Sequence, residues 1–588
     1  MSEIKAIPEL EEREIKNELD TLRHSTAHVL AHAVKNLYPK TQFGIGPTIE
    51  EGFYYDIELD VTLIPEDLLR IEDEMKKIIA QNHSFERQEW EAKDATELFK
   101  NLNQSFKLEI IKDLGAAKVS TYTEGDFIDL CRGPHVDKTG RIKIFKLLSI
   151  AGAYWRGNPQ NKQLQRIYGT AFFTQQELAE YLHIQEEAKK RDHRKLGKEL
   201  DLFSFDSIAP GGPFFHPKGT VIYNRLIQFM REFYQQYQYQ EVITPQILDI
   251  SLWHRSGHYE NYKENMYFIE ENEREYAVKP MNCPGNALIY RTHKRSYREL
   301  PLRLADFGRI HRLEASGALS GLTRVRSFAQ DDAHIFCALD QIETEIQTLI
   351  EMIFKIYKIF GFQNTEIFLS TRPVKRVGSD AFWDQAEDAL KKALDQSKAP
   401  YKINAGDGAF YGPKIDFFVH DALKRPWQLG TIQLDFNMPE RFELEYVGAD
   451  NTAHRPVMIH RAVLGSLERF IGVLIEHYAG AFPFWLAPIQ CIVIPIAQDQ
   501  QNYCKDFHTK LCEKGFRAEL DDRSESLNLK TREAQMKKIP YMLVAGQREV
   551  SAQTFSVRKY AEKTSQTLPH EELVKLFLDQ EDLGKFHA

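Results

Sequence analysis

The chain has 588 residues, a formal net charge of −9 at pH 7, and a composition of 43% hydrophobic and 27% charged residues. This length is too great for one hydrophobic core, so we expect three or four domains of ordinary globular composition. The net charge neither supports nor excludes a nucleic-acid partner, because such binding needs only a local basic surface.

The sequence predicts neither a targeting signal nor a disulfide framework. The acidic start, MSEIKAIPELEEREIKNELD, has no apolar secretory core. The uncharged run 479–497 contains Pro483, Pro488 and Pro495, which would interrupt a membrane helix, so we interpret it as a buried loop and strand and expect no membrane partner. The six cysteines form no CxxC pair, which indicates a reduced, cytoplasmic protein.

The first pattern that carries chemistry is a set of histidines on a helix that we expect over residues 9–37. His24, His28 and His32 are spaced four residues apart and therefore share one helical face. Later in the chain, Cys131 and His135 are also four residues apart. An HxxxH pair with a CxxxH pair is a four-ligand zinc pattern, but the same groups also suit a hydrolytic pocket or a packed cluster of histidines.

Residues 176–201 have a helical period and mixed charge, which predicts a connector helix into the next domain. The stretch KKRDHRK at 189–195 suits contact with RNA phosphates, and it equally suits a solvated helix face.

Residues 303–334 carry five arginines and two alternating runs, LADFGRIHRLE and TRVRSFAQDDAHIF, on either side of the connection ASGALSG. The alternation predicts two antiparallel strands joined by a loop. Arg312 and Glu314, two residues apart, would share one face of the first strand, and Arg324, Arg326 and Phe328 would be spaced likewise on the second. Guanidiniums, a carboxylate and a ring on one face suit a nucleoside triphosphate, whereas the alternative is a charged, solvated hairpin.

The last hundred or so residues, 489–588, alternate apolar strands with helical patterns. The strands are CIVIPIA, a second around FRAEL, and YMLVAG. This alternation predicts a small α/β domain with a mixed sheet.

Three stretches resemble the signature motifs of class II aminoacyl-tRNA synthetases. HRLE at 311–314 resembles motif 2, and GSLERF at 465–470 resembles motif 3. The helix that runs into YQEVITP, ending at Pro245, resembles motif 1, which is a dimer element in these enzymes. The resemblance therefore implies a homodimer.

A more specific resemblance is to threonyl-tRNA synthetases. MNCPG at 281–285, QDDAHIFC at 330–337 and MIHRAVLGSLERF at 458–470 are similar to the corresponding segments of that family. The resemblance covers nearly the whole chain, from about residue 20 to the C-terminal region. Only about twenty residues precede His24, too few for the small ubiquitin-like domain that usually comes first, so we expect either a form without that domain or a truncated chain.

The implied fold is a multidomain combination of α+β and α/β parts. It comprises a class II catalytic core with an antiparallel sheet, an N-terminal α+β editing domain and a C-terminal α/β anticodon-binding domain. The implied boundaries are 1–191 for the editing domain with its connector helix, 192–485 for the catalytic domain and 486–588 for the anticodon-binding domain.

The implied function is ATP-dependent attachment of L-threonine to tRNA(Thr) through a threonyl-adenylate, with Mg²⁺ accompanying ATP. Hydrolytic editing of mischarged seryl-tRNA(Thr) is also implied, because one methyl group supports discrimination of only about 1–3 kcal/mol. The alternatives are a synthetase for another amino acid, a zinc-dependent hydrolase that uses only the N-terminal domain, and a non-catalytic RNA-binding regulatory paralogue of a class II synthetase.

The resemblance also assigns residues of the catalytic domain. One Zn²⁺ per subunit would be held by Cys283, His334 and His460, leaving a position for the amino and hydroxyl groups of threonine. The remaining threonine-binding residues would be Gln330, Asp332, Tyr411 and Gln433. ATP would be bound by Arg312, Glu314, Arg324, Phe328 and Arg469. Catalytic roles would fall to Arg312, Arg469 and His258, although simple surface placement is the alternative for His258.

Two further sets belong to the outer domains. The resemblance favours the hydrolytic interpretation of the N-terminal pattern and leaves metal binding there open. The editing pocket would comprise His24, His28, Tyr55, Lys107, Asp129, Cys131 and His135. In the last domain, Glu549 and Arg558 would contact anticodon bases by their edges.

Overall fold

The computed structural model describes residues 18–585. The chain forms two compact units, Met1–Glu186 and Glu187–Ala588, and each is described by itself. The helix expected over 9–37 is present as α1 (Glu18–Leu37), and the part of that expectation before residue 18 lies outside the described residues.

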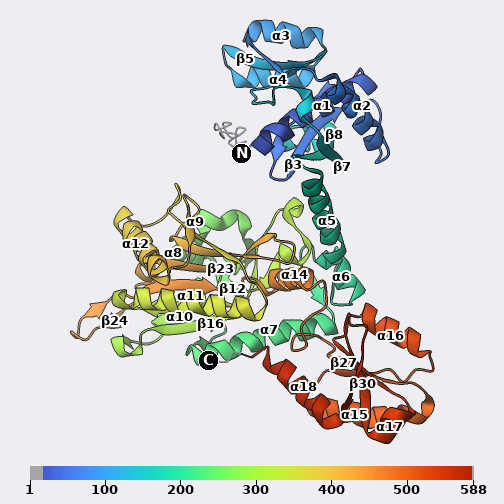
Figure 1. Ribbon diagram of the computed structural model, residues 1–588. Coiled ribbons are helices and arrows are strands. Elements are labelled where there is room, and N and C mark those ends of the chain that lie inside the picture. The colour runs from blue at the N-terminus through green and yellow to red at the C-terminus, as the bar shows by residue number, and fades with distance from the viewer. Residues whose placement is uncertain (1–17, 586–588) are drawn as a thin grey trace. The chain divides into compact units, whose positions relative to one another are not determined.

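The first unit is built around an antiparallel sheet of order β1-β3-β8-β7, with β2 paired to β3. Helix α1 packs on β3 and β8, and α2 packs on α1 (Figure 1). Leu30 and Val34, four apart on α1, join a core with Phe53, Ile57 and Ile167 of the sheet. The bounds are β1 (Gln42–Phe43), β2 (Thr48–Ile49), β3 (Gly52–Glu58), α2 (Asp67–Gln81), β7 (Ile144–Tyr154) and β8 (Gln163–Phe172).

A smaller antiparallel sheet of order β4-β5-β6 completes this unit. Its elements are β4 (Glu86–Glu91), α3 (Ala92–Asn101), α4 (Ser105–Leu114), β5 (Lys118–Glu124) and β6 (Phe127–Leu130). Phe99, Ile111 and Val119 form its core. Strand β6 contacts α1, so the residues that follow it, 131–135, begin beside the helix that carries the histidines.

The expected connector helix is two helices, α5 (Gln175–Arg191) and α6 (His193–Glu199). They are separated at Asp192, whose backbone is non-helical (φ −47°, ψ 119°) and whose side chain accepts a hydrogen bond from Arg194 N. An aspartate in this position caps the N-terminus of a new helix, which is why the sequence period continues while the helix does not. The basic stretch 189–195 is therefore divided between two helices.

The second unit contains an eight-stranded sheet of order β11-β16-β19-β26-β23-β22-β20-β21. The six strands from β16 to β20 pair antiparallel, and each edge strand pairs parallel with its neighbour. The implied antiparallel core is thus confirmed. The strands are β11 (Gln240–Glu241), β16 (Leu302–Asp306), β19 (Asp332–Cys337), β20 (Thr365–Ser370), β21 (Tyr401–Asn404), β22 (Lys414–His420), β23 (Pro426–Asp435) and β26 (Val457–Ala462).

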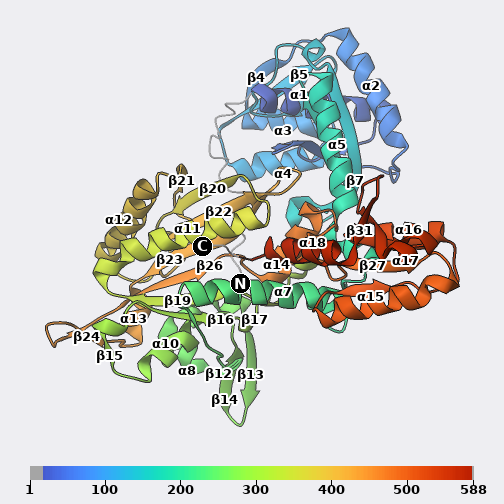
Figure 2. The ribbon, with the colours of Figure 1, turned by 60° about the horizontal axis from the view of Figure 1, so that its bottom comes forward.

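One face of this sheet carries the main core. Helices α11 (Ile342–Ile359) and α12 (Asp380–Ser397) lie over it (Figure 2), and α7 (Pro217–Gln236) and α14 (Leu467–His477) contribute to the same core. Along β19, Ile335 and Cys337 join this core, and the alternate residues His334 and Phe336 face the other side. The second face is where the expected site residues gather.

The hairpin predicted over 303–334 is present but interrupted. β16 pairs with β19, and beyond Asp306 the shorter strands β17 (Arg309–His311) and β18 (Ser327–Ala329) continue the pairing, with Ile310 opposite Phe328. The connecting loop includes two short 3-10 turns, Ser316–Ala318 and Gly321–Thr323.

The remaining short elements before the C-terminal part complete this region. In chain order they are β9 (Phe203–Phe205), β10 (Pro213–Phe215), β12 (Ile247–Asp249), α8 (Ile250–Ser256), α9 (His258–Tyr262), β13 (Tyr267–Glu271), β14 (Arg274–Val278), α10 (Cys283–Arg291), β15 (Arg295–Ser296), α13 (Asn437–Arg441), β24 (Tyr446–Val447) and β25 (Ala453–His454).

The C-terminal part has the predicted mixed sheet, of order β28-β27-β29-β30-β31. The strands β27 to β29 pair parallel, and β30 and β31 are added antiparallel. The elements are β27 (Cys491–Pro495), α15 (Gln501–Glu513), β28 (Ala518–Leu520), α16 (Leu527–Met536), β29 (Tyr541–Ala545), α17 (Gln547–Ala552), β30 (Thr554–Lys559), β31 (Gln566–Pro569) and α18 (His570–Asp582).

Within residues 18–585, no helix combines the length and apolar character needed to cross a membrane. The uncharged run 479–497 is, as predicted, a largely buried loop that leads into β27. All six cysteines are free thiols.

Candidate functional sites

The register of the large sheet brings the expected metal ligands together. His334 of β19 is directly opposite His460 of β26, and Gln433 of β23 is opposite His460 on its other side. Directly opposed residues on neighbouring antiparallel strands point to the same face, so these three side chains form a row. The two imidazole centroids are 4.9 Å apart and the rings are nearly perpendicular.

Cys283, the first residue of α10, completes this cluster. Its sulfur and one nitrogen each of His334 and His460 all lie within 4.8 Å of one another, and all three residues are buried. His334 Nδ1 is buried without a hydrogen-bond partner, which is costly for a polar atom unless it has a ligand. One sulfur and two nitrogens form the donor set of a zinc site with an open position, so these residues fit the ion.

His258 lies against the same cluster, so the alternative of surface placement is wrong. The residue is fully buried at the start of α9. Its Nδ1 is 2.8 Å from Ser256 Oγ, and its Nε2 is 3.1 Å from Met281 Sδ and 3.8 Å from Cys283 Sγ. Burial, followed by the nearby charge of His460, lowers the pKa of His258 to about 3, so the imidazole is neutral at pH 7.

Three of the expected threonine-binding residues border the metal ligands. Asp332 Oδ2 accepts a hydrogen bond from Asn282 Nδ2 at 3.0 Å, and burial raises the pKa of this carboxyl. The Tyr411 hydroxyl donates to Gln433 Oε1 at 2.7 Å. The Tyr411 ring centroid is 5.0 Å from that of His460. Polar groups therefore converge beside the position that the three ligands leave open.

Asp331 is a buried residue that the sequence did not single out. Its carboxylate accepts hydrogen bonds from the backbone N–H groups of residues 463–465, at 2.9 to 3.0 Å, and lies 3.3 Å from Arg461 Nη1. The preceding residue, Gln330, forms a β-bridge with Ser466. These contacts tie the start of β19 to the beginning of α14. A second acid in the string QDDAH was the only sequence signal for it.

Two of the expected ATP-binding arginines have no carboxylate within ion-pair distance in the described part of the chain. The guanidinium of Arg312 lies 5.2 Å from the ring centroid of Phe328 and 5.7 Å from that of Tyr262. Arg469 is half-buried on α14, and its Nε has no hydrogen-bond partner in the described part of the chain. Burial, followed by the charge of Arg324, lowers the pKa of Arg469. Cations held in this way suit a polyphosphate ligand.

Arg324 and Glu314, both expected to contact ATP, are paired with each other. Arg324 Nη2 and Nε lie 3.0 and 3.2 Å from Glu314 Oε2. Arg326 Nε donates to the Glu314 carbonyl at 2.9 Å, which holds the backbone of this strand in place. The roles implied for Arg324 and Glu314, at phosphate and adenine respectively, would require this exposed ion pair to separate, at a cost of about 1 kcal/mol or less.

Glu468, next to Arg469, is a second residue that sequence reasoning missed. It is fully buried, and its Oε2 accepts the Ala329 N–H at 3.1 Å. Its Oε1 lies 3.2 Å from Arg309 Nη1 and accepts the Tyr223 hydroxyl at 3.4 Å. One carboxylate therefore joins α14 to the motif 2 strands and to α7. Burial raises the pKa of Glu468 to about 7.

In the first unit, the four residues of the N-terminal pattern converge. His24, His28, Cys131 and His135 each place one nitrogen or sulfur within 4.8 Å of the others. Cys131 Sγ is 3.3 Å from Nε2 of both His24 and His135. His135 Nδ1 is 3.1 Å from Ser25 Oγ, which lies one residue from His24 on α1. The three imidazole rings also pack on one another, with centroids 4.2 to 5.3 Å apart.

The other three expected editing residues form a buried polar group next to this cluster. Lys107 Nζ is 2.5 Å from Asp129 Oδ1 and 3.1 Å from the Tyr55 hydroxyl. The Tyr55 hydroxyl donates to Asp129 Oδ2, and His28 Nε2 lies 3.8 Å from the same oxygen. All seven expected residues are thus in one place, brought there by α1, β3, α4, β6 and the loop 131–135 that follows β6.

Burial sets the protonation of the editing cluster. It lowers the pKa of His24, His28 and His135 and raises the pKa of the Cys131 thiol to about 12. Three neutral imidazoles and a thiol suit the orientation of a water molecule by hydrogen bonds. The third spaced histidine, His32, does not join them and pairs instead with Glu124 and Asp126.

The expected anticodon residues lie in the C-terminal part. Glu549 on α17 accepts the Gly546 N–H at 2.9 Å, as in a helix capping box. Arg558 on β30 is paired in register with Met542. Both side chains are half-buried, so each retains surface for a ligand.

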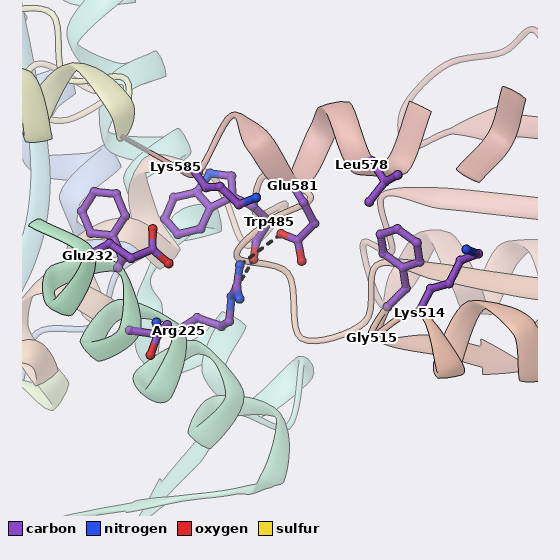
Figure 3. Close-up of a pocket in the computed structure, with 12 residues that line it drawn as sticks. Arg225, Glu232, Trp485, Lys514, Gly515, Leu578, Glu581 and Lys585 are labelled. Carbon is purple, nitrogen blue, oxygen red and sulfur yellow. Dashed lines mark hydrogen bonds and ion pairs between the residues drawn. The ribbon is translucent and has the colours of Figure 1, made fainter. Parts of the chain in front are cut away.

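A cavity of about 220 Å³ lies between α7 and α18 and contains none of the expected site residues (Figure 3). Arg225 of α7 donates to the Trp485 carbonyl at 3.1 Å and to Glu581 Oε2 at 3.1 Å. Arg517 Nη1 lies 3.4 Å from Glu581 Oε1. These contacts hold the C-terminal part against α7, so we interpret the cavity as a domain junction.

Three family models match the chain. The tRNA synthetase class II core domain (G, H, P, S and T) matches residues 262–478, and the anticodon binding domain matches residues 490–580. The threonyl and alanyl tRNA synthetase second additional domain matches residues 119–168.

Curated relatives match along most of their length. A threonine–tRNA ligase of Clostridium tetani is 54% identical over 96% of this chain and 88% of its own length. One of Clostridium botulinum (strain Okra) is 56% identical over 91% of this chain and 85% of its own length. Among solved structures, the RNA binding domain of threonyl-tRNA synthetase from Cryptosporidium parvum has a TM-score of 0.65 and 45% identity, covering 68% of this chain and 99% of that chain.

Proposed function

The chain belongs to the threonyl-tRNA synthetase family, and from this premise we propose how its residues perform the reaction. The enzyme attaches L-threonine to tRNA in an ATP-dependent reaction and edits mischarged seryl-tRNA. The observation that carries our assignment of the synthetic site is the convergence of Cys283, His334 and His460 on one sheet face. A regulatory paralogue would have no need of that cluster or of Arg312 and Arg469, neither of which has a carboxylate within ion-pair distance among residues 18–585.

In the proposed synthetic site, Cys283, His334 and His460 hold Zn²⁺, which would supply a Lewis-acid position for the amino and hydroxyl groups of threonine. Asp332 accepts a hydrogen bond from the threonine hydroxyl, and Gln330, Tyr411 and Gln433 complete the pocket. Valine has nearly the same shape but no hydroxyl, so it would leave Asp332 unsatisfied and be rejected strongly.

Adenylation follows from charge placement. Arg312 neutralises the threonine carboxylate and the α-phosphate as they approach, and Arg324 and Arg469 hold the γ-phosphate with Mg²⁺. Phe328 and Arg469 enclose the adenine ring, and Glu314 accepts from its amino group. Such catalysis consists of positioning and electrostatic stabilisation without a covalent enzyme intermediate. His258 takes part in proton handling during transfer to the tRNA, and its position 3.8 Å from Cys283 Sγ supports this role.

In the proposed editing pocket, the imidazoles of His24, His28 and His135 and the thiol of Cys131 position and activate water. Lys107, Asp129 and Tyr55 would orient the seryl group beside them. At pH 7 the lowered pKa values keep these histidines neutral, so their rings can accept hydrogen bonds from water and orient it. Hydrolysis of seryl-tRNA with retention of threonyl-tRNA is the expected outcome.

We also propose the organisation of the whole protein. The editing domain with its connector comprises residues 1–191, the catalytic domain 192–485 and the anticodon-binding domain 486–588, where Glu549 and Arg558 contact anticodon bases. The family matches at 262–478 and 490–580 fall inside the latter two ranges. The free thiols of all six cysteines support a reduced, cytoplasmic location.

A homodimer is proposed from the motif 1 segment. Just beyond β11, Ile243 is 90% exposed and Ile247 is 54% exposed, which is unfavourable for large apolar side chains unless a partner covers them. Light scattering on the purified protein should give twice the chain mass, and Ile243→Glu should shift it toward the monomer. A monomeric wild-type protein would contradict the proposal.

The decisive experiment for the function is ATP–pyrophosphate exchange with threonine, serine and valine, together with zinc content. We expect strong exchange with threonine, weak exchange with serine and none with valine, and about one zinc per chain from the catalytic cluster. Exchange with none of the three by folded, zinc-containing protein would contradict the synthetic activity and favour the regulatory alternative.

A further inference from the structure

A third cluster of titratable residues, Asp192, His193 and Glu476, lies outside the sites described above. His193 is the first residue of α6, and Glu476 is near the end of α14; both are buried. His193 Nδ1 is 2.7 Å from Glu476 Oε1. On the other side of the ring, His193 Nε2 accepts the backbone N–H of Leu322 at 3.0 Å.

The partners of His193 fix its tautomer. A backbone N–H can only donate, so Nε2 carries no proton, and the proton on Nδ1 is donated to the Glu476 carboxylate. Asp192 Oδ1 is occupied by the Arg194 N–H at 2.8 Å. With both ring nitrogens and the aspartate engaged, the cluster is a hydrogen-bond relay and not a metal site.

The relay ends on the turn that carries Arg324. Leu322 is the central residue of the 3-10 turn Gly321–Thr323, and Ser320 N donates to the Arg324 carbonyl at 3.2 Å, which closes the turn. Holding Leu322 therefore holds the backbone from which Arg324 extends. The other end of the relay, Glu476, lies on α14, the same helix that carries Arg469.

Two glycines allow this close approach. Gly321 has a φ of +48°, and a Cβ there would lie 2.2 Å from His193 Nε2. A Cβ on Gly472, in the middle of α14, would lie 3.2 Å from Leu322 Cβ. Glycine is suited to both positions, because it adopts positive φ without strain and leaves room for neighbouring atoms.

We propose that His193 is a positioning residue for ATP. By joining the Arg324 turn to α14, it sets the separation at which Arg324 and Arg469 meet the triphosphate. This inference rests on the roles proposed above for those two arginines. His193 contacts no substrate itself, so its loss should weaken ATP binding and leave threonine binding unchanged.

The test replaces His193 with asparagine or with glutamine, each of which retains a polar atom near only one of the two imidazole nitrogens. Asparagine retains an amide donor near the position of Nδ1 and has no atom at Nε2, whereas glutamine places an amide oxygen at Nε2. In the full-length protein we expect His193→Asn to weaken Mg·ATP binding, and to raise the KM for ATP in exchange, by about 3- to 10-fold, the worth of one hydrogen bond. His193→Gln should restore most of the loss. His183→Asn, at an exposed position on α5, is the matched control.

A double-mutant cycle identifies the route of the effect. If His193 acts through Arg324, His193→Asn should change Mg·ATP binding by less than about 2-fold in an Arg324→Ala background. The inference would be overturned if the two substitutions weakened Mg·ATP binding by independent, multiplicative factors. It would also be overturned if His193→Asn left ATP binding unchanged or raised the KM for threonine equally. Calorimetric titration with Mg·ATP measures binding without catalysis. If the wild type showed no exchange, the proposed function would be contradicted, whereas the role of His193 in ATP binding would still be decided by the titration.

Discussion

His334 and His460 stand directly opposite each other on the antiparallel strands β19 and β26, with ring centroids 4.9 Å apart. On β19, the alternate residues Ile335 and Cys337 point into the main core on the other side of the sheet. The alternation of side chains along the strands therefore separates a face that carries the zinc ligands from a face that packs in the core.

The zinc assignment predicts different behaviour for two buried cysteines. Cys283→Ser should remove the zinc of the catalytic cluster, because a serine hydroxyl is a poor ligand beside two imidazoles. Cys337→Ser, on the core face of β19, should retain it. Elemental analysis of the purified variants gives the zinc content directly. Loss of zinc in Cys337→Ser alone, or retention in Cys283→Ser, would contradict the assignment.

The same analysis decides whether the editing cluster also holds metal. With a hydrolytic, metal-free pocket, the wild type should contain about one zinc per chain and Cys131→Ser should leave that number unchanged. A wild type with about two, one of which is lost in Cys131→Ser, would show that the cluster of His24, His28, Cys131 and His135 is a second zinc site.

Arg469→Met should stabilise the ligand-free protein while it abolishes adenylation. The Arg469 side chain is half-buried and has no carboxylate partner among residues 18–585, and methionine removes that charge. We expect an increase in the thermal unfolding midpoint, equivalent to about 1 kcal/mol, with exchange reduced by at least about 100-fold. Addition of Mg·ATP should protect the wild type from unfolding and have little effect on the variant. A lower midpoint would indicate that the charge is satisfied in the folded protein.

Glu468 predicts a specific dependence of stability on pH. Its pKa in the folded protein is raised to about 7, so between the ordinary pKa near 4.5 and pH 7 the folded state retains a proton that the unfolded state has lost. The carboxyl therefore contributes stability that is present below about pH 4.5 and is lost as the pH rises through 7. Relative to Glu468→Gln, the wild type should lose about 2 to 3 kcal/mol between pH 5 and 8.

Unfolding midpoints of the two proteins at several pH values provide the measurement. The difference between them is the relevant quantity, because glutamine retains the shape and the acceptor for Ala329 but does not titrate. A difference that is constant from pH 5 to 8 would mean that Arg309 keeps Glu468 ionised throughout.

Lys107→Met should impair the editing domain alone. It leaves Asp129 buried without its cation, and breaking a buried ion pair in this way costs about 3–5 kcal/mol. We expect a lower unfolding midpoint for the editing domain and seryl-tRNA hydrolysis reduced by at least about 100-fold, with threonine-dependent exchange retained. The double variant Lys107→Met with Asp129→Leu should recover much of the stability, because it removes the unpaired buried charge of Asp129. It should recover none of the hydrolysis, because hydrolysis needs both side chains.

Some features of this protein are determined by short stretches of sequence. The spacing of His24 and His28 places them on one face of α1 whatever surrounds the helix, since a helical period needs only a few residues. The alternation on either side of 315–321 likewise predicted the antiparallel hairpin, and the alternating strands and helices after residue 489 predicted the mixed C-terminal sheet.

Other features required the tertiary structure. No spacing relates Cys283, His334 and His460, which meet only because β19 and β26 are neighbours in one register and α10 begins beside them. The period of 176–201 continues through Asp192, yet the helix breaks there and His193 becomes buried between α14 and the Arg324 turn. Local periodicity is encoded by adjacent residues, whereas burial and side-chain partners depend on which distant segments pack together, and only the folded chain decides that.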